Sequence, residues 1–148
     1  MNPKPEAPSL KLDHIGIAVE NLEEAREQFA KLLGRSASPV EEVPSEGVRV
    51  SFFEVMGCRI ELLEGTSPES PIRRFLERGR SGVHHISFAL EGGDLGSFLA
   101  SLLAKGVEAL DRAPRPGSEG SEVFFVHPRA AGGVLVEFSR RNEKARSR

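Results

Sequence analysis

Apolar residues recur along the chain with two periods. They alternate with polar or small residues in some segments, and in the segments that follow they recur at every third or fourth position, as on one face of a helix. Alternating apolar positions predict strands at residues 12–19 and 83–90. Each predicted strand is followed by a predicted amphipathic helix, whose apolar positions are Leu22, Ala25, Phe29, Leu32 and Leu33 in the first copy and Leu95, Phe98, Leu99, Leu102 and Leu103 in the second. Gly34 and Gly106 mark the helix ends, because glycine readily adopts the left-handed conformation of a C-cap.

Each half continues with further predicted strands after its helix. Two more strands are predicted in each copy, "VRVSFFEV" and "CRIELLE" in the first and "EVFFVH" and "GVLVEFS" in the second. Both last strands carry Gly-x-x-x-Glu, ending at Glu61 and Glu137. One additional short strand is expected near residues 38–43 and 107–111. The chain is therefore predicted to contain two related β-α-β-β units, and helices against a mixed sheet make an α+β fold.

The composition of the connecting segments sets the expected domain organisation. A helix should begin near Ser70–Pro71, since proline suits a first helical turn. We predict a flexible leader at 1–9, one domain at 10–140 (module one about 10–65, a linker helix about 68–80, module two about 82–140) and a basic tail at 141–148.

Strand alternation divides the side chains of each half between two faces. Ile15 and Ile17 should face the helices, whereas His14 should face the other side with small neighbours. The same parity places His85 on the side of His14, and His84 on the helix side. Glu61 and Glu137 oppose the apolar residues of their own strands.

Four chemically capable residues should therefore converge on one hollow: His14, Glu61, His85 and Glu137. Buried carboxylates need partners, because an unpaired charge is costly to desolvate. Two imidazoles and two carboxylates would satisfy one another by binding a divalent cation. Mixed nitrogen and oxygen ligands suit zinc, cobalt, manganese, nickel or iron(II).

Composition narrows the remaining possibilities. The 148 residues carry a net charge of −2, which argues against a nucleic-acid partner. There is no apolar run long enough to span a membrane and no signal-peptide core in the leader. A single cysteine, Cys58, excludes an internal disulfide framework and fits a reducing compartment. We therefore expect a cytoplasmic location.

The segments "LDHIGIAV", "GVRVSFFEV", "IELLEGTSPESPIRRFLERGRSGVHHISF" and "HPRAAGGVLVEF" resemble the vicinal oxygen chelate superfamily, which includes the glyoxalases, bleomycin resistance proteins and dioxygenases. Within it they are most similar to the methylmalonyl-CoA epimerase family, over roughly residues 10–140. The resemblance implies two βαβββ modules forming a mixed, cup-shaped sheet around a metal site. Carried over position by position, the implied metal ligands are His14, Glu61, His85 and Glu137.

The resemblance also implies the reaction, proton transfer at C2 of an acyl-CoA substrate that interconverts (2R)- and (2S)-methylmalonyl-CoA. Inversion needs proton-transferring groups on both faces of an enolate. Glu137 is one candidate. These epimerases usually carry Glu-x-Gly-Val before the third strand, but here Ser45 occupies the position of the glutamate. Glu46, one residue later, is our candidate for the second base, although strict strand register would point it the wrong way.

Two other functions remain open from the sequence. A glyoxalase-like lyase or isomerase would use the same metal and enolate chemistry, and the loss of the expected base at Ser45 keeps this alternative open. A non-catalytic small-molecule binding protein on the same fold is the other, although such relatives generally lose metal ligands. The family resemblance implies Co²⁺ as the metal, with Zn²⁺, Mn²⁺ and Ni²⁺ as alternatives, and a homodimer.

Overall fold

The computed structural model describes residues 8–79 and 82–141. The predicted leader up to residue 7, Arg80 and Ser81, and the tail beyond residue 141 lie outside the described residues. The first half contains β1 (Leu10–Ala18), α1 (Leu22–Leu33), β2 (Glu41–Val43), η1 (Pro44–Glu46), β3 (Val48–Val55) and β4 (Cys58–Gly65). Helix α2 (Pro71–Glu77) joins it to β5 (Gly82–Leu90), α3 (Leu95–Ala104), β6 (Arg115–Pro116), η2 (Ser118–Gly120), β7 (Glu122–Val126), η3 (Pro128–Ala130) and β8 (Val136–Arg140).

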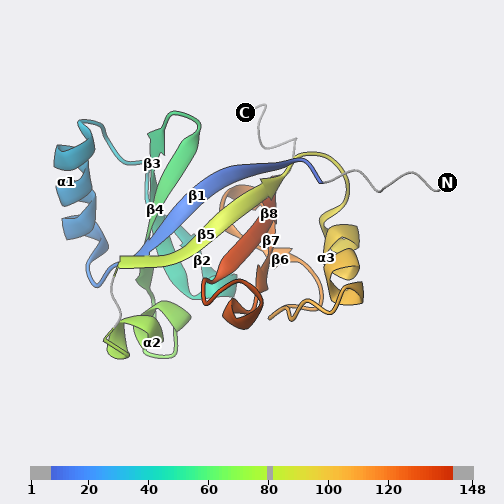
Figure 1. Cartoon of the computed structure of the whole chain (residues 1–148). Helices are drawn as coiled ribbons and strands as arrows, with labels where there is room; N and C mark the ends of the chain where they lie inside the picture. Colours follow the sequence, from blue (N-terminus) through green and yellow to red (C-terminus); the bar gives the residue numbers. More distant parts are fainter. Residues whose placement is uncertain (1–7, 80–81, 142–148) are drawn as a thin grey trace.

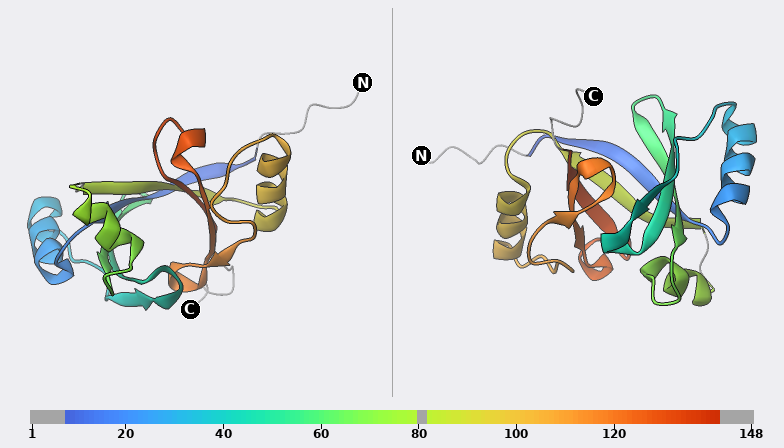
Figure 2. Two further views of the ribbon diagram at one scale, coloured as in Figure 1. Left: turned by 90° about the horizontal axis from the view of Figure 1, so that it is seen from below. Right: turned by 180° about the vertical axis from the view of Figure 1, so that it is seen from behind.

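In the described part of the chain the strands form one eight-stranded sheet, ordered β2-β3-β4-β1-β5-β8-β7-β6. The sheet curls into a cup, with α1 and α3 at its two outer flanks (Figures 1 and 2). β1 pairs parallel with β4 and β5 parallel with β8, while β1 and β5 meet antiparallel at the centre. The predicted α+β fold with two related modules is confirmed.

Local signals in the sequence explain where the helices begin and end. The Asn21 side chain accepts a hydrogen bond from the backbone N–H of Glu24, and Gly34 ends α1 with φ = 64°. Ser70 lies directly before Pro71, and its side chain accepts a hydrogen bond from the backbone N–H of Ile72. These are the side-chain and glycine caps that satisfy the free backbone groups of helix ends.

Apolar residues fill the spaces between the sheet and its helices. Leu22, Ala25, Phe53 and Leu62 form the buried cluster beneath α1. A second cluster, Leu90, Leu95, Leu99, Phe124 and Val126, lies beneath α3. A third cluster fills the space between α2 and the strands β2 to β4.

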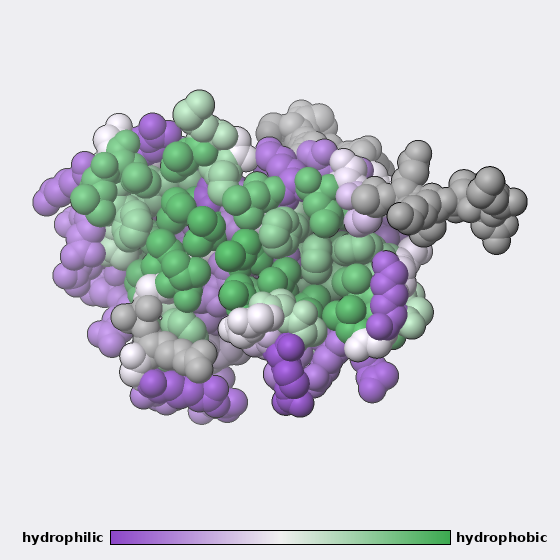
Figure 3. Space-filling view, viewed as in Figure 1, coloured by the Kyte–Doolittle hydropathy of each residue, from purple (hydrophilic) through white to green (hydrophobic). Residues whose placement is uncertain are grey.

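Two features differ from the predicted pattern. The short strand expected at 107–111 is reduced to one isolated bridge at Ala109, and the edge strand lies later, at β6. The outward residues of β1 and β5 were expected to meet helices, but Ile15 and Ile86 at the centre of the sheet remain half-buried. Figure 3 shows this face as a broad apolar surface over β1 and β5.

Candidate metal centre and active site

Each of the four predicted ligands lies on one of the four central strands, which are adjacent in the sheet. His14 is on β1, Glu61 on β4, His85 on β5 and Glu137 on β8. Gly16 pairs with both Glu61 and His85, and Ser87 pairs with both His14 and Glu137. All four side chains are buried, with no more than 5% of their surface exposed. The structure thus brings together residues that are up to 123 positions apart in the sequence.

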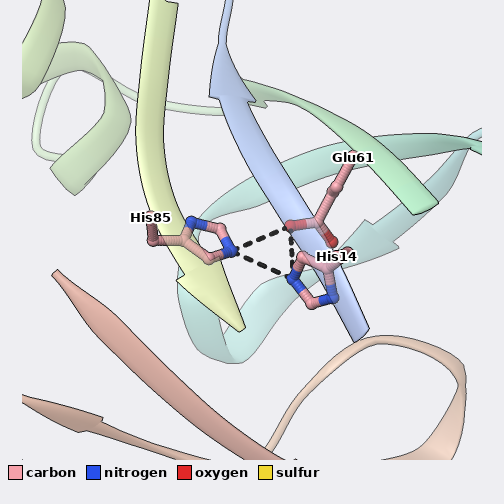
Figure 4. A group of neighbouring side chains, drawn as sticks. All are labelled: His14, Glu61 and His85. Carbon is pink, nitrogen blue, oxygen red and sulfur yellow. Dashed lines mark hydrogen bonds and ion pairs between the residues drawn. The ribbon is translucent and has the colours of Figure 1, made fainter. Parts of the chain in front are cut away.

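The side chains of His14, Glu61 and His85 point toward one another (Figure 4). The Nε2 atoms of the two histidines are 3.0 Å apart. Glu61 Oε1 lies 3.4 Å from His14 Nε2 and 3.3 Å from His85 Nε2. These three residues therefore present one donor atom each to a common point.

Glu137 approaches the same place from the second module. Its Oε1 is 3.4 Å from His14 Nε2. Glu137 therefore contacts the site through His14. The three residues whose donor atoms lie closest to one another are His14, Glu61 and His85.

Gly16 has a steric role between the two histidines. A Cβ atom at this position would lie 2.2 Å from Cε1 of His85. The space beside His14 that small residues create is therefore filled by the partner histidine itself, which is why its ring can reach the centre of the sheet.

The charges in the site are strongly coupled. Burial alone would raise the pKa of Glu61, but hydrogen bonds with His14 and His85 and the charges of these rings lower it to about 2. Burial also disfavours the charged form of His14, yet Asp13, Glu61 and Glu137 outweigh it and raise its pKa to about 10. Burial is the main cause of a raised pKa of Glu137, with the charge of Glu61 adding to it. When no cation is bound, the raised pKa values of His14 and Glu137 favour their protonated forms, and these protons reduce the repulsion between the buried carboxylates.

The donor set fits a divalent cation. Two atoms that each lie about 2.1 Å from one ion, at roughly a right angle, are about 3 Å apart, as the histidine nitrogens are. Two neutral imidazoles and two carboxylates would also balance the charge of a dication in a buried place, where an unbalanced charge is costly.

Glu46 reaches this site in spite of the strand-register argument. Residues Pro44–Glu46 form a 3-10 turn that Gly47 ends with φ = 65°, so strand alternation does not apply there. The Glu46 side chain is 15% exposed. It lines a small hollow together with His14, Glu61 and Glu137, and a larger cavity together with His85.

The surroundings of Glu46 favour its protonated form. Burial and the charges of Glu137 and Glu61 raise the pKa of Glu46 to about 8, against the opposing effect of Arg115. Arg115 Nη1 is 3.7 Å from its Oε1, which has no hydrogen-bond partner among the described residues. Ser45, by contrast, donates its hydroxyl hydrogen to the Pro116 carbonyl at 2.8 Å and does not take the place of a carboxylate.

Sequence reasoning missed two residues of the site, Asp13 and His84. Parity placed His84 on the face opposite His85, and no role was predicted for Asp13. In the structure Asp13 Oδ2 is 2.6 Å from His14 Nδ1, and His84 Nδ1 is 2.9 Å from His85 Nδ1. His84 also packs edge-on against Phe75 of α2, so its contact with a helix was predicted correctly. An acidic residue or a second histidine directly before each histidine was the available signal.

A cavity of about 380 Å³ leads from the site toward solvent, lined by residues that include Glu46, His84, His85 and Phe125. A second cavity of about 500 Å³ adjoins it, sharing Pro71, His84, Leu110 and Leu135. Its lining includes the exposed Arg74 and Arg78 of the α2 region.

Two βαβ-containing modules that enclose a buried His/Glu centre define a class of metal-binding α+β proteins. The chain belongs to the glyoxalase/bleomycin resistance protein/dioxygenase superfamily, whose model matches residues 13–125. The His-Glu-His group of this chain could bind a metal ion.

Curated relatives define the similarity more narrowly. The mitochondrial methylmalonyl-CoA epimerase of Dictyostelium discoideum is 39% identical over 129 residues, which cover 86% of this chain and 76% of the relative. The ethylmalonyl-CoA/methylmalonyl-CoA epimerase of Cereibacter sphaeroides is 36% identical over 129 residues, covering 86% and 95%. The predicted resemblance to methylmalonyl-CoA epimerases is confirmed.

Solved structures agree with the sequence comparison. A variant of Streptomyces coelicolor methylmalonyl-CoA epimerase in complex with 2-nitronate-propionyl-CoA superposes with a TM-score of 0.84. It is 31% identical, and the match covers 90% of this chain and 95% of that one. The cup-shaped fold that the family resemblance implied is thus shared with an epimerase of known structure. Among residues 8–79 and 82–141, no helix combines the length and apolar character needed to cross a bilayer.

Proposed function

We propose that this protein is a metal-dependent epimerase that interconverts (2R)- and (2S)-methylmalonyl-CoA by moving the proton at C2. The observation that carries the proposal is the presence of two carboxylates beside one buried His/Glu centre, Glu46 from the first module and Glu137 from the second. Inversion at one carbon needs two proton-transferring groups, and a single carboxylate would serve only one face.

His14, Glu61 and His85 would hold the cation, with Glu137 as the fourth candidate ligand. Co²⁺ is our first expectation from the family resemblance, and the same donors accept Zn²⁺, Mn²⁺ or Ni²⁺. When bound, the cation supplies Lewis-acid stabilisation of the negative charge that develops on the thioester oxygen.

The carboxylates of the chain carry the proton. In one direction ionised Glu137 takes the proton from C2, and protonated Glu46 delivers a proton to the other face. In the reverse direction the two residues exchange roles. A raised pKa suits Glu46 for this task, because a group that titrates near the working pH can both give and take a proton.

The two adjoining cavities provide a path for an acyl-CoA. The surface of the inner cavity is mainly apolar, and its lining includes Glu46 and His85, beside which the acyl group would lie. The outer one includes Arg74 and Arg78, whose guanidinium groups are suited to phosphate. Bulk water would be displaced from the inner cavity by the bound substrate.

We further propose that the protein acts as a cytoplasmic homodimer. Leu10, Leu12 and Val83 are exposed on the outer face of β1 and β5, beside half-buried Ile15 and Ile86. An apolar face of this kind is typical of a protein–protein interface. Because β1 and β5 are related by the internal repeat, the face suits pairing with a second copy.

Proton exchange in D₂O tests the proposed reaction. Protein loaded with Co²⁺ should introduce deuterium at C2 of methylmalonyl-CoA with inversion, and removal of the metal by a chelator should stop the exchange. Glu46→Gln should lower epimerisation by about 10²- to 10⁴-fold, yet retain exchange of one isomer through Glu137. Glu54→Gln, at an exposed position of β3, is the control and should match the wild type.

The outcomes separate the proposed function from the other two. If Glu46→Gln inverted C2 at the wild-type rate, Glu46 would have no part in the proton transfer. Loaded wild-type protein that exchanged no proton but converted the adduct of methylglyoxal and glutathione would be a glyoxalase-like enzyme. Metal uptake with neither activity would leave a binding protein.

A further inference from the structure

Strands β1 and β5 each contain one extra residue that is not paired across the β1–β5 ladder, at equivalent positions of the two modules. Leu12 and His14 pair with the consecutive residues Phe88 and Ser87, so Asp13 is extra in β1. Gly16 and Ile17 pair with His85 and Val83, so His84 is extra in β5. Such β-bulges break the alternation of side chains and redirect the extra residue.

Each bulge brings the extra residue beside the histidine that follows it. Asp13 Oδ2 is 2.6 Å from Nδ1 of His14, and His84 Nδ1 is 2.9 Å from Nδ1 of His85. In both modules the contact is made to Nδ1. Both Nε2 atoms are left facing the centre of the site, 3.0 Å apart.

The two extra residues are themselves held in place. Arg59 Nη2 donates to Asp13 Oδ2 at 3.2 Å, and Arg141 Nη2 donates to Asp13 Oδ1 at 3.3 Å. The ring of His84 lies edge-on to that of Phe75, with the ring centroids 4.9 Å apart. Neither Asp13 nor His84 therefore needs to move to meet its histidine.

The hydrogen bond at Nδ1 decides what Nε2 can do. A neutral imidazole carries one proton, and if Nδ1–H donates to a neighbour, the lone pair is on Nε2. Metal-ligating histidines are commonly fixed in this way by an acceptor at the other ring nitrogen. Asp13 can act only as the acceptor when ionised, and the unprotonated Nδ1 of a neutral His84 can do the same.

Resting on the proposed metal site, we propose that Asp13 and His84 are positioning residues that hold His14 and His85 in the tautomer that ligates through Nε2. The two modules achieve the same result with different chemistry. A carboxylate supports the first histidine and an imidazole supports the second. The charged acceptor makes the stronger hydrogen bond and the more basic ligand, so Asp13 should contribute more to metal affinity than His84.

Zinc affinity and histidine tautomers together test this proposal. Asp13→Ala and His84→Ala should weaken Zn²⁺ binding, measured by competition with a chelator, by about 10- to 100-fold, with the larger loss for Asp13. Asp13→Asn and His84→Asn keep an acceptor at nearly the same place and should recover most of the affinity. Ring ¹⁵N shifts of the zinc-loaded wild type should show Nδ1 protonated and Nε2 bound in both histidines.

Two control variants leave Asp13, His84 and their neighbours unchanged. Glu54→Gln on β3 and Leu32→Ala on α1 change exposed side chains away from both histidines, so both should bind Zn²⁺ like the wild type. The asparagine variants keep the test decisive if an alanine variant fails to fold.

The proposal is overturned if the alanine variants fold and bind Zn²⁺ as the wild type does, if zinc is bound through Nδ1, or if the wild type takes up no zinc. Failure of the proposed reaction would look different. Zinc affinities and tautomers would follow the expected order while methylmalonyl-CoA remained unchanged.

Discussion

At the scale of single residues, Glu46 is a carboxyl group in a place that disfavours its charge. Its neighbours include the carboxylates of Glu61 and Glu137, and its nearest cation, Arg115, remains 3.7 Å away. A residue held in such surroundings lowers the stability of the fold when it ionises. Ionisable groups with strongly shifted pKa values are typical of functional sites.

This arrangement predicts a pH-dependent stability difference for Glu46→Gln in metal-free protein. The folded pKa of about 8 lies above the unfolded value of 4.5, so the folded state binds the extra proton between these values. The contribution of Glu46 to stability is therefore full below pH 4.5 and is lost as pH rises through 8. Urea unfolding should find the variant more stable than the wild type by about 2–4 kcal/mol at pH 9, but little different at pH 5. A difference that does not change with pH would contradict this, and Glu54→Gln controls for the loss of one charge.

At the scale of elements, the turns beside the two edge strands hold the cup closed. The sheet ends at β2 and β6, yet the Ser45 hydroxyl donates to the Pro116 carbonyl, and the Glu119 N–H donates to the Glu41 carboxylate at 3.0 Å. Arg115 on β6 faces Glu46 on the turn after β2. Ser45, which stands where related epimerases usually carry glutamate, thus ties one module to the other.

The edge contact predicts a double effect of Ser45→Ala. Loss of one exposed hydrogen bond should lower the free energy of unfolding by about 1 kcal/mol. Glu46 is the next residue, so the variant should also position the Glu46 carboxyl group less well. We therefore expect kcat to fall roughly tenfold. Ser101→Ala is the matched control, since Ser101 donates its hydroxyl hydrogen to the Phe98 carbonyl on α3, far along the chain from the site. Equal effects of the two variants on kcat would contradict the role of the edge contact.

At the scale of the whole molecule, the internal repeat generates both the site and the apolar outer face. β1 and β5 cross antiparallel with Ile15 paired to Ile86 at the centre. The inward side chains His14 and His85 from this pair of strands provide the two histidines of the candidate metal centre. Outward side chains from the same crossing form the surface seen in Figure 3. The proposed dimer would remove this apolar area from water, which is favourable.

A charge on this surface should separate the proposed dimer. Leu12→Asp would bury an unpaired carboxylate in the interface, and a penalty of about 3 kcal/mol corresponds to a roughly 100-fold weaker dimer. Sedimentation equilibrium of the wild type and the variant measures the effect. Leu32→Asp, at an exposed position of α1, should leave association unchanged. A wild-type protein that stayed monomeric at micromolar concentrations would contradict the proposed dimer.

The sequence by itself determined the parts of the molecule that depend on local pattern. The period of two and the helical spacing predicted the strands and helices of each half, because burial of an apolar face selects these periods. Gly34 and Ser70 marked helix ends through backbone freedom and a short-range hydrogen bond. Repetition of His14 at His85 and of Glu61 at Glu137 then pointed to one shared centre.

Only the tertiary structure decided the features that depend on pairing between distant strands. The bulges at Asp13 and His84 arise where β1 and β5 pair, so parity along a single strand did not predict that either side chain would lie beside the histidine that follows it. The turn that directs Glu46 inward also contacts the opposite edge of the cup, through a hydrogen bond between residues about 70 positions apart in sequence. Strand alternation is a local rule, whereas a bulge or an inward turn is stabilised by what lies across from it.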